Sequence, residues 1–180
     1  MKPKLIMIMV CSLDGVIATD KNTDSFSWNS PEDKSHFRKL TKEIGTVIMG
    51  SKTFQEVGMT PLKGRKNIIV TSRPDDYKVT EDTFFISGNA EDVVSYLQIN
   101  GIKTAAVVGG SSVNSQFLQA GLIDELYITV EPILFGKGLH LAESISDQVN
   151  LQLIDSQKLN EQGTMLLHYQ VLNNHDSKQN

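Results

Sequence analysis

Short runs rich in apolar residues alternate along this chain with segments whose apolar residues recur at helical spacing. The strand-like runs lie at residues 5–11, 46–50, 66–72, 83–87, 104–110 and 125–134, and the helical segments at 31–43, 51–57, 90–98 and 112–121. None of the runs approaches the ~18 apolar residues of a membrane span, and their length is typical of strands buried on both faces. Alternating β and α units predict a largely parallel sheet with helices on both faces.

The last third of the chain has a different pattern. Residues 150–159 and 163–172 alternate apolar and polar side chains and are joined through "NEQG", which indicates an antiparallel hairpin at a sheet edge. The predicted fold class is therefore α/β, with a mixed, mostly parallel central sheet flanked by helices and a C-terminal antiparallel hairpin. We expect one domain over residues 1–172 and a disordered polar tail over 173–180.

Size and charge narrow the kind of ligand. The chain has 180 residues, which suits one ordinary domain, and a formal net charge of −4 with 21% charged residues. This balance gives no electrostatic reason to expect a nucleic acid or an anionic membrane as partner. A small-molecule substrate is expected instead, and the chain is either a monomer or a homodimer.

Cys11 is the single cysteine, so no internal disulfide can form and the cytoplasm is the expected compartment. The start, "MKPKLIMIMVCSL", resembles a short secretion signal, but "SLDG" follows it without a small-x-small cleavage pattern, which favours a buried strand. The four histidines, at positions 36, 140, 168 and 175, show no ligand spacing, and no metal site is expected.

Two strand-to-helix junctions contain glycine followed by hydroxyl side chains. "VIMGSKTF" places Gly50, Ser51, Lys52 and Thr53 at one junction, with Ser51 the expected helix cap, and "VVGGSSVN" places residues 109–112 at the other. In open α/β sheets ligands bind beyond the carboxyl ends of the strands, where free helix N–H groups attract anions. One such junction is an ordinary connection, whereas two in one domain favour a diphosphate. Neither matches the G-x-G-x-x-G or G-x-x-x-x-G-K-[ST] spacing.

The stretch "WNSPEDKSHFRKLT" marks a helix start, with Ser30 as cap, Pro31 in the first turn, and Glu32 and Asp33 at the positive end of the helix dipole. Asp33 has two possible roles here. Ser30-x-x-Asp33 resembles a capping box with Asp in place of Glu, and the same carboxylate could move a proton. His36 is expected on the exposed side of this helix.

Taken together, "WNSPEDKSHFRKLT", "VIMGSKTF", "PLKGRKNIIVTS", "VVGGSSVNSQFL" and "ELYIT" resemble the ordered motifs of dihydrofolate reductase, as far as Thr129. "SLDGVIA" and the region from residue 121 are similar to the reductase domain of riboflavin biosynthesis, a relative with the same fold. The resemblance implies NADPH-dependent hydride transfer, most simply from NADPH to 7,8-dihydrofolate. A reductase of a phosphorylated ribosylaminopyrimidine and a catalytically idle nucleotide-binding module remain as alternatives.

The resemblance also implies roles for individual residues. Asp33 matches the carboxylate that holds the pterin and assists protonation of its N5, and Thr129 matches the threonine bonded to it. The implied substrate contacts are Met9, Val10, Trp28, Phe37, Leu62 and Arg65, the last gripping the α-carboxylate of the glutamate tail. The implied cofactor contacts are Ala18, Gly50, Ser51, Lys52, Thr53, Thr71, Ser72, Arg73, Val108, Gly109, Gly110, Ser111, Ser112 and Val113.

Several positions depart from the family pattern. Ser51 stands where a basic residue often meets the 2′-phosphate of the cofactor, and Arg73 is displaced by about one position from a similar role. Asn114 replaces an expected tyrosine. Lys34 stands where an apolar residue usually touches the substrate, and its ammonium could instead receive a substrate phosphate as a point charge.

Overall fold

A computed structural model describes residues 1–19 and 27–172, so the predicted disordered tail lies outside the described residues. Its helices are α1 (Pro31–Ile44), α2 (Ser51–Glu56), α3 (Ala90–Ile99) and α4 (Ser111–Gln119), with one 3₁₀ turn, η2 (Pro74–Asp76). Its strands are β1 (Lys4–Ser12), β2 (Val16–Ala18), β3 (Thr46–Gly50), β4 (Lys66–Val70), β5 (Thr83–Ile86), β6 (Thr104–Val107), β7 (Glu125–Glu131), β8 (Leu139–His140), β9 (Asn150–Lys158) and β10 (Met165–Leu172).

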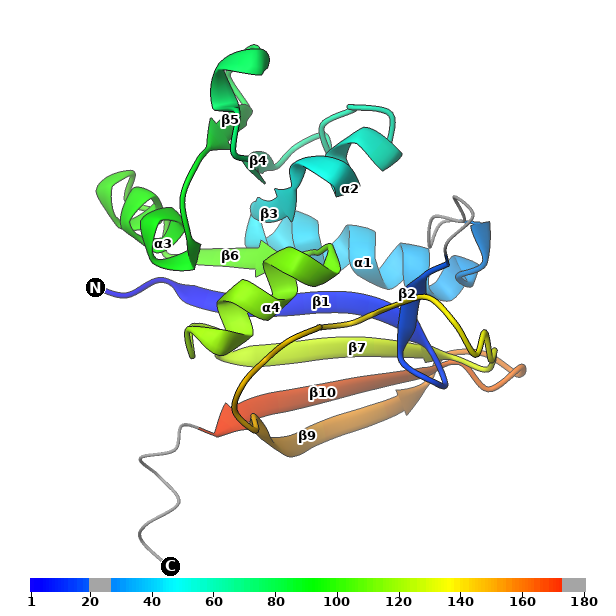
Figure 1. The fold of residues 1–180 in the computed structure, drawn as a ribbon. Helices are drawn as coiled ribbons and strands as arrows, with labels where there is room; N and C mark the ends of the chain where they lie inside the picture. The colour runs from blue at the N-terminus through cyan, green and yellow to red at the C-terminus, as the bar shows by residue number, and fades with distance from the viewer. Residues whose placement is uncertain (20–26, 173–180) are drawn as a thin grey trace, which may run out of the picture.

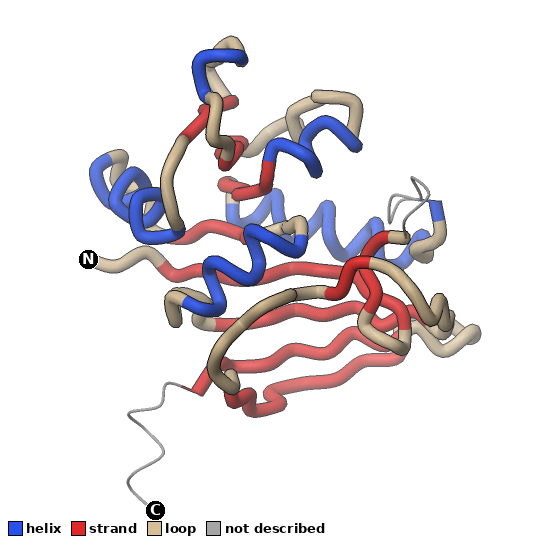
Figure 2. The backbone as a smooth tube through the Cα atoms, viewed as in Figure 1, coloured by secondary structure: helices blue, strands red, loops and turns tan. Residues whose placement is uncertain are grey.

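Eight strands form one twisted sheet in the order β5-β4-β3-β6-β1-β7-β10-β9 (Figures 1 and 2). The pairs from β5 to β7 are parallel, whereas β10 is antiparallel to both β7 and β9. This confirms the predicted mixed, mostly parallel sheet with its C-terminal hairpin at one edge. Within the described residues no helix is long and apolar enough to cross a membrane.

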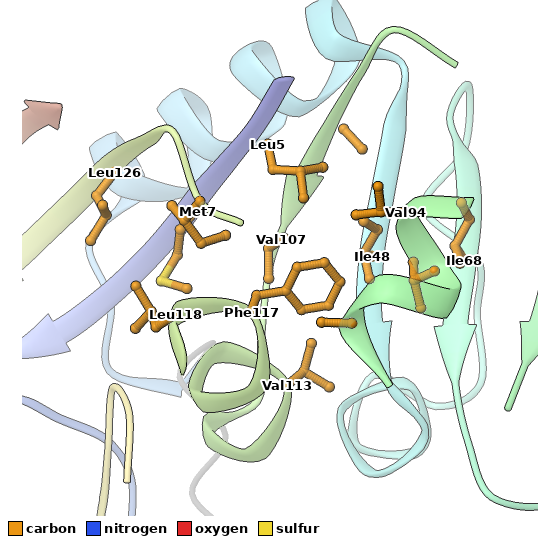
Figure 3. Close-up of a cluster of buried hydrophobic side chains, with 14 of the residues drawn as sticks. Leu5, Met7, Ile48, Ile68, Val94, Val107, Val113, Phe117, Leu118 and Leu126 are labelled. Carbon is orange, nitrogen blue, oxygen red and sulfur yellow. The ribbon is translucent and has the colours of Figure 1, made fainter. Parts of the chain in front are cut away.

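Side chains that alternate along β1 build a core on each face of the sheet. Leu5 and Met7 pack in one core cluster with residues of α3 and α4, in which the Phe117 ring of α4 points toward Val107 of β6 (Figure 3). Ile6 and Ile8 face the other side, toward α1. Burial on both faces explains why the central strands are continuous apolar runs.

Two local predictions need correction. The polar stretch "DGVIATDKNTDSFSWNS" has no apolar period, and the sequence predicts no strand there, yet β2 forms within it and pairs with β8 in a separate two-stranded sheet. Backbone hydrogen bonding to a distant segment decided this, because three residues are too few to carry a periodic signal. The predicted cap of α2 is also wrong, since Gly50 is the N-cap and Ser51 is the first helical residue.

Candidate active site

Two adjoining hollows open near the carboxyl ends of the parallel strands. The larger, which we call the cleft, has a volume of about 910 Å³, and the smaller, which we call the inner cavity, about 250 Å³. Both are lined by Met9, Val10, Thr53, Val57 and Val108. Two ligands bound in the two hollows would therefore meet at this shared apolar wall.

The two glycine junctions lie side by side and form part of the cleft. The amide of Gly50 donates a hydrogen bond to the carbonyl oxygen of Gly109 over 2.9 Å, and a cis peptide bond joins Gly109 to Gly110. A Cβ atom at Gly110 would lie 3.0 Å from Oγ1 of Thr53. A side chain at position 110 would thus displace Thr53 by a few tenths of an ångström where the second junction approaches the first, and residues of both junctions line the same cleft.

Most of the residues implied for the cofactor line the cleft. They are Ala18, Gly50, Ser51, Lys52, Thr53, Thr71, Ser72, Val108, Gly110, Ser111, Ser112 and Val113. Gly109 and Arg73 do not line it, and the Arg73 side chain is 81% exposed with its Nε 3.6 Å from the carboxylate of Asp76. Among the described residues that line it, Lys52 is the one cation, and Glu56 and Glu143 are the acids.

Asp33 lies in the wall of the inner cavity and is only 5% exposed. Its carboxylate accepts a hydrogen bond from Nδ2 of Asn29 over 2.6 Å and another from the Thr129 side chain. Burial raises the pKa of Asp33, and the charge of Glu131 adds to this, while the bonds from Thr129 and Asn29 act in the opposite direction. A buried carboxyl with a raised pKa can hold a proton closer to neutral pH than an exposed one.

The capping geometry separates the two roles that the sequence left open for Asp33. Oγ of Ser30 accepts a hydrogen bond from the amide of Asp33 over 3.2 Å, so Ser30 caps the helix as predicted. In a full capping box the Asp33 carboxylate would accept the Ser30 amide. That amide instead donates to Oε1 of Glu131 over 2.7 Å. The Asp33 carboxylate is therefore not used for capping and faces the cavity.

Arg65 lines the same cavity and is only 7% exposed, which excludes a solvent-facing loop position. Its Nη1 donates to Oγ1 of Thr41 over 2.7 Å and its Nη2 to the carbonyl of Lys63 over 3.1 Å. The buried Nε has no hydrogen-bond partner among the described residues. Burial and the neighbouring guanidinium of Arg38 lower the pKa of Arg65. An anion in the cavity would satisfy these donors.

Of the other implied substrate contacts, four line the inner cavity and one does not. Met9, Val10, Phe37 and Leu62 line the inner cavity, and so does Lys34. Trp28 does not line it and packs edge-on against Phe135, with ring centroids 5.3 Å apart. The prediction for His36 is wrong, because its ring is half-buried 5.8 Å from that of Tyr127. Neighbouring elements cover this helix face, which its own sequence could not show.

Two buried polar residues of the site were missed in the sequence. Asn29 precedes the helix cap, where an amide is ordinary, and Glu131 ends an apolar run, where a carboxylate is unusual enough to have been a signal. Cys11 is buried, and burial first, then the charges of Asp14 and Asp33, raise its pKa to about 11. In the described part of the chain, no three His, Cys, Asp or Glu residues are grouped to hold a metal ion.

An eight-stranded sheet with two adjoining hollows and a buried carboxyl in the smaller one defines the dihydrofolate reductase-like class of reductase folds. The chain belongs to the RibD C-terminal domain family, whose model matches residues 3–165. It is 26% identical over 176 residues to the uncharacterized protein YwjB of Bacillus subtilis, covering 94% of this chain and 98% of that protein.

Two further comparisons connect the chain with dihydrofolate reductases. The dihydrofolate reductase of Bacillus subtilis is 33% identical over 137 residues, covering 76% of this chain and 73% of that enzyme. The structure of dihydrofolate reductase from Enterococcus faecalis, complexed with NADP(H) and RAB-propyl, superposes with a TM-score of 0.75 at 24% identity, covering 94% and 97% of the two chains. The predicted superfamily is thereby confirmed.

Proposed function

We propose that this protein is an NADPH-dependent reductase of 7,8-dihydrofolate. The observation that carries the proposal is that one cavity contains both a buried carboxyl, Asp33, and a buried guanidinium with unused donors, Arg65. Dihydrofolate needs this pair, because it has an amidine-like pteridine edge and a glutamate carboxylate. The 33% identity to a dihydrofolate reductase supports the same substrate.

The cleft offers backbone amides of a helix start and one cation to the cofactor. Residues of both glycine junctions line it, and a Cβ atom at Gly50 would lie 3.2 Å from a methyl group of Val113. Backbone amides at the start of α4, together with the ammonium of Lys52, would hold the diphosphate. When bound, NADPH supplies the hydride for the reduction.

In this proposal Asp33 binds the substrate by hydrogen bonds and assists the transfer of a proton to it. An ionised carboxylate can accept two hydrogen bonds from the pteridine edge, and a raised pKa makes proton transfer toward N5 easier at neutral pH. Thr129 and Asn29 orient the carboxyl from two sides. The apolar wall around it, which includes Phe37 and Leu62, excludes water and strengthens these interactions.

The direct test is oxidation of NADPH by the purified protein when dihydrofolate is added. The loss of the near-ultraviolet absorbance of NADPH measures this oxidation. We expect turnover that needs both ligands and that Asp33→Asn abolishes. Binding of both ligands without turnover would support the idle nucleotide-binding module instead. Failure to bind dihydrofolate would refute the proposal.

A phosphorylated ribosylaminopyrimidine is the second candidate, and a specific observation favours it. Lys34 and Arg38, one helical turn apart on α1, both line the inner cavity with Arg65. Three cations around one small cavity suit a phosphate as well as a carboxylate. The membership of the RibD C-terminal domain family points in the same direction. The same assay with the pyrimidine phosphate in place of dihydrofolate decides between the substrates.

A further inference from the structure

Glu131 is a second buried carboxylate beside Asp33, and the proposed reaction does not use it. It is 3% exposed at the end of β7. Its Oε1 accepts the amide of Ser30 over 2.7 Å, and its Oε2 accepts the hydroxyl of Thr164 over 2.6 Å. Both oxygens are therefore engaged, one with the start of α1 and the other with the turn between β9 and β10.

The first turn of α1 is attached to β7 at two points. Thr129 and Glu131 are two residues apart on the strand, so their side chains lie on the same face of the sheet. Thr129 bonds to the carboxyl of Asp33, and Glu131 bonds to the amide of Ser30. Ser30 in turn accepts the amide of Asp33. The main chain of Asp33 is thus held to Glu131 through one intervening residue.

We propose that Glu131 is a positioning residue for Asp33. Through its hydrogen bonds with Ser30 and Thr164 it fixes the first turn of α1 against β7, and it places a second buried carboxylate beside that of Asp33. The inference rests on the proposed function, because it takes Asp33 as the group that handles the substrate's proton. It assigns no contact with substrate to Glu131, which does not line the inner cavity.

Several charged or titratable groups face Asp33 from the surrounding elements. Cys11 lies on β1, His36 is on the same helix as Asp33, and Glu131 is on β7. Lys34, Arg38 and Arg65 line the shared cavity. The charge of Glu131 raises the pKa of Asp33, that of His36 lowers it, and burial is the largest cause of the upward shift.

The substitution Glu131→Gln separates charge from hydrogen bonding. Glutamine has the same shape, can still accept the Ser30 amide and can donate to Thr164, but it is neutral. We expect the apparent pKa of Asp33, followed by ¹³C NMR of its carboxyl carbon in the free protein, to fall by about half a unit or more. Turnover at neutral pH should fall about threefold or more as the protonated fraction decreases.

Glu32→Gln is the matched control, since it removes a carboxylate from the same helical turn. Glu32 is exposed and accepts a hydrogen bond from Nδ2 of Asn160 over 3.2 Å. We expect this variant to leave the pKa of Asp33 nearly unchanged. The inference is overturned if Glu131→Gln leaves that pKa in place, or if Glu32→Gln lowers it equally.

Thr164→Val provides a second route if Glu131→Gln does not fold. It keeps the charge of Glu131 but removes one of its two hydrogen bonds, so kcat should fall while the pKa of Asp33 does not. A lower pKa in this variant would contradict the inference. Because the titration needs no substrate, an unmodified protein that fails to reduce dihydrofolate would refute the proposed function without deciding the role of Glu131.

Discussion

Asn29 donates its side-chain amide to the carboxylate of Asp33 over 2.6 Å, although the two residues lie on either side of the Ser30 helix cap. Both residues line the inner cavity, so this bond holds the carboxylate in the cavity wall. The cap is left to Ser30, so the structural and the proposed chemical roles fall on different side chains. Each can be removed without the other.

Asp33→Asn should lower kcat at neutral pH about 100-fold or more, the usual effect of losing an acid–base group. Asparagine cannot be ionised and cannot pass a proton to the substrate. Steady-state kinetics with dihydrofolate measure kcat. A cofactor titration measures the affinity for NADPH, which should stay unchanged. Glu32→Gln, which removes an exposed carboxylate from the same helical turn, is the control and should leave the rate nearly unchanged. A loss of less than about threefold in Asp33→Asn would exclude a catalytic role.

The same substitution should stabilise the protein at neutral pH. The folded-state pKa of Asp33 is raised above its ordinary value of 3.8, so the folded state binds a proton more readily than the unfolded state. Stability from this group is fully present below pH 3.8 and is lost as pH rises through the folded pKa. Thermal unfolding should therefore show a higher Tm for Asp33→Asn at pH 7, by about 2–4 °C for each kcal/mol. The difference should vanish near pH 4, and a constant difference at all pH values would contradict this origin.

Arg65→Ala should raise the KM for dihydrofolate by a factor that corresponds to about 2–3 kcal/mol of binding free energy. This is the cost of losing a charged hydrogen-bonded pair. The affinity for NADPH should not change. Lys63→Ala, which removes an exposed cation two residues away, is the control. Lys34→Leu should be tolerated. If Lys34→Leu abolishes activity while Arg65→Ala has no effect, the phosphorylated pyrimidine becomes the better substrate.

Gly110→Ala should weaken NADPH binding by more than tenfold, because its Cβ atom would lie 3.0 Å from Oγ1 of Thr53 inside the cleft. Lys52→Ala should weaken it by about fivefold, as expected for an exposed ion pair worth up to about 1 kcal/mol. Quenching of protein fluorescence measures both affinities. Lys66→Ala, an exposed lysine outside the cleft, is the control. Unchanged affinity in Gly110→Ala would place the cofactor elsewhere.

Cys11 should be inert toward thiol reagents in the folded protein. Its pKa of about 11 leaves almost no thiolate at pH 8, and the side chain is 6% exposed. Ellman's reagent should therefore react only after denaturant is added. Rapid reaction in native buffer would show that β1 opens locally.

The sequence by itself determined the strands of the main sheet, the start of α1 and the two glycine junctions. Residues 5–11 and 105–107 are continuous apolar runs because both faces of their strands are covered, and such a pattern is local. Ser30 and Pro31 start α1 because capping depends on groups within one helical turn. The hairpin of β9 and β10 was likewise visible in two alternating segments joined by a short turn.

Only the tertiary structure decided which partner each polar side chain takes. Asp33 could equally have bonded the Ser30 amide, and it does not because β7 presents Thr129 to the carboxyl and Glu131 to that amide. The resemblance alone implied that Arg65 contacts substrate, and in the structure Thr41 of α1 and the carbonyl of Lys63 hold it in the cavity wall. Thr129, Glu131 and Thr41 come from distant parts of the chain, brought together by the fold, and a periodic pattern contains no information on contacts between elements.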